Sequence, residues 1–340
     1  MADNRRTLGV LVVVAVGLLL VGRFVIRSDA SKGSEEGQQD EPGEPRGSGS
    51  SPSPSPSTST STSTSTSTKK ARYESALVDG SILGLSSGAG TALAVGESGL
   101  IFRHKLDDPK WTKMEAPAKG ALRSVAQQVD EAIAVGDGGA ILEMEGEAWK
   151  SVASPTNRTL RAIVYTSYGA VAVGDGGTIV RRLAPHMAWQ AEASGTANDL
   201  FGACSGLRDV WIVGAAGTII SRNMDAWKVQ PSLGAASLRA VACDDHAAIA
   251  VGDKGAMFER LDDVGWHPSA SSVTVDLFAV SAPLGTTSFT VVGAAGTVVH
   301  VTRDASAEAP VLSFDLRAVT EGALGTWVAG ERGVFRRVPQ

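Results

Sequence analysis

AVGDGGAIL, residues 134–142, places three glycines and an aspartate between two apolar runs. A glycine-rich turn of this kind either cradles a phosphate or makes the corner of a β-hairpin. The stretch decides the fold because it is one of seven copies: ALAVGESGLIF (92–102), AIAVGDGGAIL (132–142), AVAVGDGGTIV (170–180), VWIVGAAGTII (210–220), AIAVGDKGAMF (248–258), FTVVGAAGTVV (289–299) and TWVAGERGVFR (326–336). Phosphate loops do not recur seven times, and no long helical pattern follows any copy, so the copies predict hairpin corners.

The copies are evenly spaced. Their first glycines follow one another by 37 to 41 residues: Gly96, Gly136, Gly174, Gly214, Gly252, Gly293 and Gly330. A period near forty, with several short strands in each unit, is typical of the blades of a β-propeller. Another short apolar run begins fourteen residues before each glycine, or sixteen in the sixth copy: ILGL (82–85), LRSV (122–125), LRAI (160–163), LFGA (200–203), LRAV (238–241), LFAV (277–280) and LRAV (316–319). We expect this run to be the innermost strand of each blade.

A tryptophan stands eleven residues before five of these inner runs: Trp111, Trp149, Trp189, Trp227 and Trp266. Each opens a polar segment that suits an outermost fourth strand. An indole ring there could pack on the neighbouring blade, so we interpret these tryptophans as scaffold residues rather than as a ligand platform.

The last unit ends one strand short, because the chain stops at Gln340 after its third strand. The segment ARYESALVDG, residues 71–80, belongs to no unit of its own. We predict that Tyr73–Leu77 lies antiparallel beside Val334–Val338, which would complete the last blade and remove an open sheet edge. The sequence therefore predicts an all-β, seven-bladed propeller of four-stranded antiparallel blades over residues 71–340, closed by an N-terminal strand.

A membrane helix is expected before the propeller. Residues 8–26 are apolar except for Arg23, and nineteen helical residues rise about 28 Å, close to the thickness of a hydrocarbon core. We favour an uncleaved signal anchor. A cleaved secretion signal is the alternative, because Arg5 and Arg6 precede the run and Ser28-Asp29-Ala30 resembles a cleavage site.

Residues 27–70 contain the run SPSPSPSTSTSTSTSTST and almost no apolar side chains. Such a segment cannot offset its ordering entropy by burial, so we expect a disordered linker rich in Ser, Thr and Pro. With the short tail of residues 1–7 inside the cell, this arrangement would hold a single-pass membrane protein with its propeller on the extracytoplasmic side, periplasmic or at the cell surface.

The charge of the predicted propeller argues against nucleic acid as a partner. Residues 1–70 hold eight of the 31 basic and seven of the 36 acidic residues, so residues 71–340 carry 23 basic and 29 acidic residues, a net charge of −6. A nucleic-acid binder usually has the opposite sign or a clustered basic stripe. Neither occurs in this sequence.

Four copies have an arginine at the second position of the inner run, and the same four have an acid just after the first glycine. The pairs are Arg123 with Asp137, Arg161 with Asp175, Arg239 with Asp253, and Arg317 with Glu331. Antiparallel register places these positions opposite each other, so we predict four structural ion pairs. An anion-binding ring of arginines is the alternative. The first copy, Leu83 with Glu97, does not follow the rule.

The fourth and sixth copies carry Phe201 and Phe278 in place of arginine, preceded by Asp199 and Asp276. These four residues form a possible partner-docking patch on the face that holds the turns between the second and third strands. The alternative, which we prefer, is local packing of each phenylalanine on the alanine that replaces the acid.

Catalytic patterns are missing from the sequence. None of His104, His186, His246, His267 and His300 falls on an inner run or has the spacing of metal ligands. The inner runs carry no carboxylates for acid–base chemistry, and no serine-nucleophile motif occurs. We therefore expect no cofactor and no metal, and we do not expect an enzyme.

Cys204 and Cys243 fall on consecutive inner runs, offset by one residue. We expect their side chains to point to opposite sides and to remain two buried thiols, with a disulfide as the alternative.

Residues 71–340, with A-V-G-x-x-G-x-I, then Trp, then L-R-x-V, resemble the bacterial seven-bladed repeats of the photosystem II assembly-factor type, which are related to BNR and sialidase-like repeats. The Asp box of sialidases, S-x-D-x-G-x-T-W, is missing, as is a catalytic arginine triad with a tyrosine nucleophile. What the resemblance implies is a fold and a scaffold role, and no photosynthetic partner is carried over.

Two functions remain open. The first is a non-enzymatic, monomeric, membrane-tethered propeller that binds a protein or assembles an envelope complex. The second is a glycan-binding or glycoside-cleaving propeller of the sialidase type, which would need paired carboxylates or stacking aromatics at one channel mouth.

Overall fold

The computed structural model describes residues 72–77, 80–88, 90–206, 209–223, 226–244, 247–261, 264–269, 271, 273–282, 288–301, 306–307 and 312–338. The tail, membrane helix and linker predicted for residues 1–70 lie outside these residues, as does His246. Within the described part of the chain, no helix has the length and apolar character that a membrane span requires.

The described strands form seven four-stranded antiparallel sheets, which we number as blades 1 to 7 in chain order. Blade 1 contains β2 (Ile82–Ser87), β3 (Thr91–Gly96), β4 (Ile101–Lys105) and β5 (Asp108–Met114). Blade 2 contains β6 (Leu122–Gln127), β7 (Ala132–Gly136), β8 (Ile141–Glu145) and β9 (Ala148–Ser151). Blade 3 contains β10 (Leu160–Thr166), β11 (Gly169–Gly174), β12 (Thr178–Arg182) and β13 (Gln190–Glu192). Blade 4 contains β14 (Leu200–Ser205), β15 (Asp209–Gly214), β16 (Ile219–Asn223) and β17 (Lys228–Val229).

The remaining blades repeat this order. Blade 5 contains β18 (Leu238–Cys243), β19 (Ala247–Gly252), β20 (Met257–Leu261) and β21 (Gly265–Pro268). Blade 6 contains β22 (Leu277–Ser281), β23 (Phe289–Gly293), β24 (Val298–Val301) and β25 (Ser306–Ala307). Blade 7 contains β26 (Leu316–Gly322), β27 (Gly325–Gly330) and β28 (Gly333–Val338), with β1 (Arg72–Leu77) as its fourth strand.

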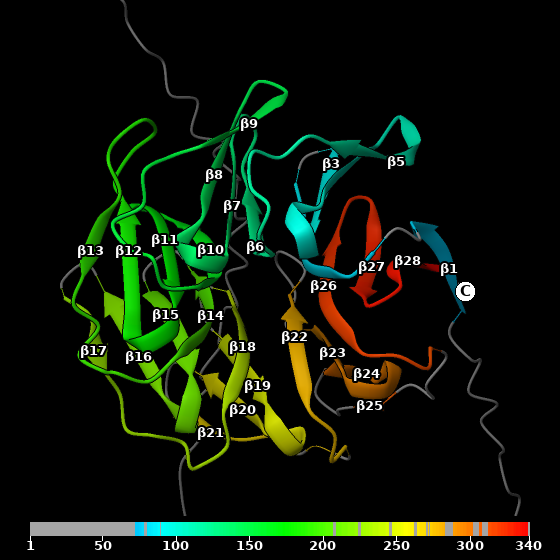
Figure 1. Ribbon diagram of the computed structural model, residues 1–340. Coiled ribbons are helices and arrows are strands. Elements are labelled where there is room, and N and C mark those ends of the chain that lie inside the picture. The colour runs from blue at the N-terminus through cyan, green and yellow to red at the C-terminus, as the bar shows by residue number, and fades with distance from the viewer. Residues whose placement is uncertain are drawn as a thin grey trace, which may run out of the picture. The chain divides into compact units, whose positions relative to one another are not determined.

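The blades stand around a common axis (Figure 1). The first strand of each blade contacts the first strands of both neighbours, and β2 contacts β26 in the same way, so the inner strands form a closed ring. The prediction that the L-R-x-V run is the innermost strand is confirmed, as is the seven-bladed, four-stranded architecture.

Strand β1 lies beside β28, at the blue and red ends of the colour scale in Figure 1. Tyr73 is opposite Arg337 and Leu77 is opposite Val334, with a bulge between Ser75 and Leu77. The two ends of the described chain therefore share one sheet.

The glycine-rich stretch of the second copy forms a four-residue connection between β7 and β8, which contains the 3₁₀ turn η2 (Asp137–Gly139). Its two outer glycines are needed for different reasons. A Cβ on Gly136, whose φ is the extended value of −169°, would lie 2.1 Å from the carbonyl oxygen of Ala121. Gly139 has a φ of +75°, which glycine adopts without the cost of a side chain. Close backbone approach, rather than positive φ, accounts for the first glycine.

Five of the other six blades have the same turn: η1 (Glu97–Gly99), η3 (Asp175–Gly177), η4 (Ala215–Gly217), η5 (Asp253–Gly255) and η6 (Ala294–Gly296). No turn leads into a long helix, so the hairpin interpretation is confirmed and the phosphate loop is excluded.

The apolar core is divided among the interfaces between blades, and each of the seven interfaces has one cluster of buried residues. The predicted tryptophans pack in these clusters against the preceding blade. Trp149 of blade 2, for example, packs with Leu93 of blade 1, and Trp189 of blade 3 packs with Ile133 of blade 2. Their scaffold role is confirmed.

The expectation of two free thiols is wrong. Cys204 on β14 and Cys243 on β18 form a disulfide that joins blades 4 and 5, with the two Cα atoms 5.8 Å apart. The two side chains do leave opposite faces of their sheets. Neighbouring blades, however, present opposite faces to each other, so the forward face of blade 4, with Cys204 and Trp211, meets the backward face of blade 5, with Val241 and Cys243. Opposite orientation therefore brings the sulfurs together.

Candidate docking site at the channel mouth

A β-bulge sets the direction in which the side chain of the second residue of each inner strand points. In all seven blades the register between the first and second strands shifts at this position. In blade 2, for example, Leu122 is opposite Gly136 and Ser124 is opposite Val135, so the residue between them has no partner across the strands. A bulge turns the side chain of such a residue away from the regular face of the sheet. The seven residues so placed are Leu83, Arg123, Arg161, Phe201, Arg239, Phe278 and Arg317.

These seven side chains line one cavity of about 350 Å³, together with Ser81, Glu97 and Glu331. Every blade contributes to the lining, so the cavity lies on the axis of the ring. We call the ten lining residues the channel mouth. The sequence indicated the recurring position but not the bulge that brings all seven residues to one place.

Three of the four predicted ion pairs form at the channel mouth. Arg123 Nε lies 2.5 Å from Asp137 Oδ1, and Arg239 binds Asp253 through Nε at 2.6 Å and Nη2 at 3.2 Å. Arg161 Nε contacts Asp175 Oδ1 in the same manner. The guanidinium groups line the cavity while each is neutralised by a carboxylate of its own blade.

The fourth pair is wrong. Arg317 Nη2 lies 2.7 Å from Asp315 Oδ2 instead of pairing with Glu331. In blade 7 four residues separate the paired Ala329 and Val334, whereas five residues separate Val135 and Ile141 in blade 2. The shorter turn lacks the 3₁₀ geometry that orients the acid in the other blades.

Phe201 and Phe278 lie among the arginines of neighbouring blades. The guanidinium carbons of Arg161 and Arg239 stand 5.4 and 5.1 Å from the ring centroid of Phe201, and that of Arg317 stands 4.0 Å from the ring centroid of Phe278. These are cation–π distances. The expectation that each phenylalanine packs on an alanine of its own hairpin did not include these arginines, because the arginines belong to adjacent blades.

Asp199 and Asp276 hold the turns of the preceding blades. Asp199 Oδ1 accepts a hydrogen bond from the backbone N–H of Gly176 at 2.7 Å, and Asp276 Oδ1 accepts one from the N–H of Lys254 at 2.8 Å. Both aspartates are half-buried, and neither lines the cavity. The structure thus brings Phe201 and Phe278 together at the channel mouth. The two aspartates lie outside the channel mouth, where they cap the turns of the preceding blades.

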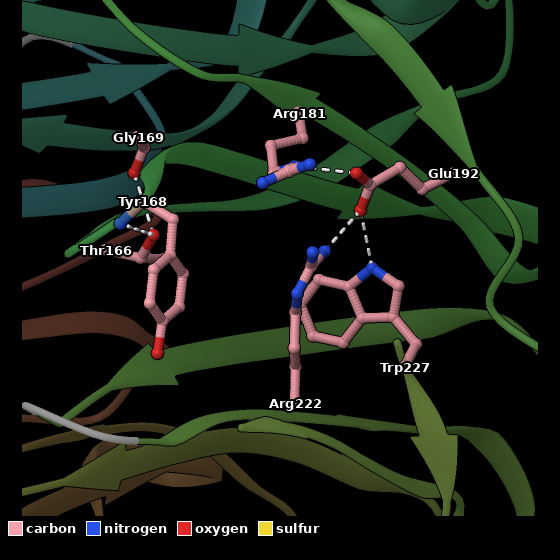
Figure 2. A network of polar contacts seen from close by, with 7 residues as sticks. All are labelled: Thr166, Tyr168, Gly169, Arg181, Glu192, Arg222 and Trp227. Atoms are coloured by element: carbon pink, nitrogen blue, oxygen red, sulfur yellow. Dashed lines mark hydrogen bonds and ion pairs between the residues drawn. The ribbon is translucent and has the colours of Figure 1, made fainter. Parts of the chain in front are cut away.

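A second polar cluster, which the sequence did not indicate, lies between blades 3 and 4. Figure 2 shows Arg181, Arg222 and Trp227 converging on Glu192. The donor nitrogens lie 2.6, 2.7 and 2.8 Å from the carboxylate oxygens. Burial alone would raise the pKa of Glu192, but the Trp227 hydrogen bond and the two arginines outweigh it and the pKa is lowered. The carboxylate is satisfied by groups of the scaffold, so this cluster is structural.

In the described part of the chain, no three His, Cys, Asp or Glu side chains gather in a way that could hold a metal ion. The arginines of the channel mouth are held by aspartates, and its aromatic rings by guanidinium groups. Such an arrangement can bind a segment of another molecule by charge, stacking and shape.

No protein-family model matches the chain. No curated protein matches it either. Solved structures share its fold: YCF48 bound to D1 peptide, at 14% identity over 80% of this chain and 96% of that chain, TM-score 0.65; RRP9 WD40 repeats, at 9% identity over 79% and 97%, TM-score 0.66; and the WD40 β-propeller domain of Doa1, at 13% identity over 79% and 97%, TM-score 0.62. At these identities the likeness shows the propeller fold alone. At that level it agrees with the resemblance to photosystem II assembly-factor repeats.

Proposed function

We propose that this protein is a non-enzymatic scaffold whose channel mouth docks an extended segment of a partner protein. The observation that carries the proposal is the convergence of all seven bulge residues on one cavity, with two phenylalanines and four arginines among them. Aromatic and arginine side chains dominate the energetics of protein interfaces. The solved structure of YCF48 with a D1 peptide supports the proposal by analogy of fold.

We further propose that residues 8–26 anchor the chain in a membrane, that residues 27–70 tether the propeller outside the cytoplasm, and that β1 closes the ring. The disulfide supports the extracytoplasmic location, because structural disulfides persist in oxidising compartments. Mass-spectrometric thiol mapping of the full chain in cells tests this location. We expect Cys204 and Cys243 to resist alkylation until reductant is added, and two freely alkylated thiols would contradict the proposal.

Phe201→Asp with Phe278→Asp tests the docking function. The control is Val129→Asp with Leu183→Asp, since these two apolar residues are exposed elsewhere on the propeller (83% and 46%). In cells expressing the full chain, cross-linking followed by mass spectrometry should recover the same partner with the wild type and the control, and lose it with the phenylalanine variant at an unchanged melting temperature. Retention of the partner by the phenylalanine variant would contradict docking at the channel mouth.

Glycan binding receives less support. A sugar needs an aromatic face on which to stack, and guanidinium groups from two neighbouring blades already stand over the ring of Phe201. A glycan array with the full chain should therefore show no binding above that of the phenylalanine variant.

A further inference from the structure

The two blades that depart from the arginine–acid pairing are neighbours. In blade 1 the bulge residue is Leu83, so Glu97 has no arginine on its own inner strand. In blade 7 Arg317 pairs with Asp315, so Glu331 is released. The inner strands β2 and β26 of these blades contact each other. The two departures therefore fall side by side in the ring and expose two carboxylates to the same cavity.

The charges that line the channel mouth do not balance. Each of the four arginines is paired with an aspartate that stands behind it. The side-chain carboxylates of Glu97 and Glu331 have no hydrogen-bond or ion-pair partner among the residues that the structure describes, and both residues are exposed. The arginines thus add no free positive charge, and the sector made by blades 7 and 1 is left negative.

The walls of this sector suit a long cationic side chain. Leu83, which lines the cavity beside Glu97, offers an apolar surface to the methylene stem that lysine and arginine carry. Phe278 lines the same cavity from blade 6, but its ring is already covered by the guanidinium group of Arg317, 4.0 Å from the ring centroid. A cationic head in this sector would therefore be held by the two carboxylates, with its stem on Leu83.

We propose, on the basis of the docking function above, that the partner segment carries a lysine or arginine whose cationic head lies between Glu97 and Glu331. The ring of arginines would suggest an acidic ligand. The pairing of every guanidinium group with an aspartate reverses that expectation, because an added anion would approach Asp137, Asp175 and Asp253 without finding an uncompensated cation.

Labelled hexapeptides test this preference directly. The probe is Gly-Leu-Arg-Leu-Gly-Ser, compared with the same peptide carrying citrulline or glutamate in place of arginine, titrated against the full chain by fluorescence anisotropy. Citrulline keeps the shape of arginine and removes its charge. We expect the arginine peptide to bind at least about fivefold more tightly than either of the others, with the preference decreasing at high salt. Equal binding of the citrulline peptide, or tighter binding of the glutamate peptide, would overturn the proposal.

A paired variant locates the effect. Glu97→Gln with Glu331→Gln removes both charges and no contact of the scaffold, and it should abolish the preference for arginine over citrulline at an unchanged melting temperature. The matched control, Glu115→Gln with Asp107→Asn, changes the net charge by the same amount outside the cavity and should keep the preference. If the Glu97 and Glu331 variant still prefers the arginine peptide to the citrulline peptide, the assignment of the cationic contact to these two carboxylates is overturned.

The two proposals fail in distinguishable ways. If the phenylalanine variant loses its cell partner while the Glu97 and Glu331 variant keeps it at wild-type yield, docking stands and the cationic contact is overturned. If both variants keep the partner, docking at the channel mouth is overturned as well.

Discussion

The interface between blades 4 and 5 and the junction between blades 7 and 1 belong to the same ring but are held by different contacts. Blades 4 and 5 are joined by the disulfide of Cys204 and Cys243, and Arg239 stands over the ring of Phe201 across the interface. Blades 7 and 1 have no such bond among the described residues. They meet through Trp111 and Trp327, whose rings pack edge to face at a centroid distance of 5.5 Å.

The junction also carries features that cost stability. The Nδ1 atom of His104 and the Nε1 atoms of Trp111 and Trp327 are buried there without hydrogen-bond partners. An unsatisfied buried polar atom is costly, and the interface between blades 4 and 5 carries one too, Nε1 of Trp266, so the junction has the greater need of support. Under the proposed closure, strand β1 supplies this support, since β1 pairs with blade 7 while the chain leads on from it into blade 1. The ring would then be held by a covalent bond at one interface and by a sheet shared between the chain ends at another.

Deleting residues 71–80 should destabilise the protein most. This change removes β1 and the five residue pairs that it forms with β28, and at about one hydrogen bond per pair and about 1 kcal/mol per lost hydrogen bond it should cost about 5 kcal/mol of stability. A thermal melt of the full chain measures it. Deleting ten residues of the predicted linker, 51–60, is the control and should leave the melting temperature unchanged. An unchanged melt for the first deletion would show that the junction holds without β1.

Next in size is the loss of the disulfide. Cys204→Ser with Cys243→Ser opens a loop of 39 residues, and the expected cost is about 2–4 kcal/mol. Urea unfolding with and without a dithiol reductant measures it. Reductant should destabilise the wild type by the same amount and leave the serine variant unaffected. A wild type indifferent to reductant would remove the distinction between the two interfaces.

Acid should weaken the junction. Burial and, after it, Arg336 lower the pKa of His104 below its ordinary value of 6.5, against an opposing effect of Asp108. The folded state thus favours the neutral imidazole, so its contribution is complete above about pH 6.5 and is lost as the pH falls toward the folded-state pKa. The wild type should lose melting temperature when the pH is lowered from about 7.5 to about 5, two values on either side of the ordinary pKa of histidine. The His104→Phe variant should lose less over the same range.

The control for this pH dependence is His267→Phe on the outer strand of blade 5, which should retain the wild-type acid loss. If His104→Phe and the wild type lose stability equally in acid, other groups govern the pH response of the junction.

Single ion pairs should contribute least. Arg239→Met and Arg317→Met each break one pair in which the arginine side chain is more than a third exposed (38% and 37%), so each should cost less than about 1 kcal/mol. Chemical denaturation of the two variants compares them directly. Both arginines also stand over a phenylalanine ring of the neighbouring blade, so a cost markedly above this value for either variant would mean that the stacking adds to the strength of that interface.

Much of the fold could be predicted because the chain contains seven versions of one unit. The glycine period placed the blades, the offset of fourteen residues placed the inner strands, and the recurrence of arginine with acid identified pairs such as Arg123 with Asp137. These contacts lie within one hairpin, where sequence distance and strand pairing determine which residues meet.

Contacts between blades could not be predicted in this way. The Cys204–Cys243 disulfide, the stacking of Phe201 between two arginines and the convergence on Glu192 depend on which faces of adjacent sheets meet. The partner of Arg317 depends on a turn that is shorter by one residue. A repeating sequence dictates how each sheet is built, because strand pairing is local. The packing of one sheet against the next sets the relative position of their side chains, and the channel mouth is made of residues from all seven blades.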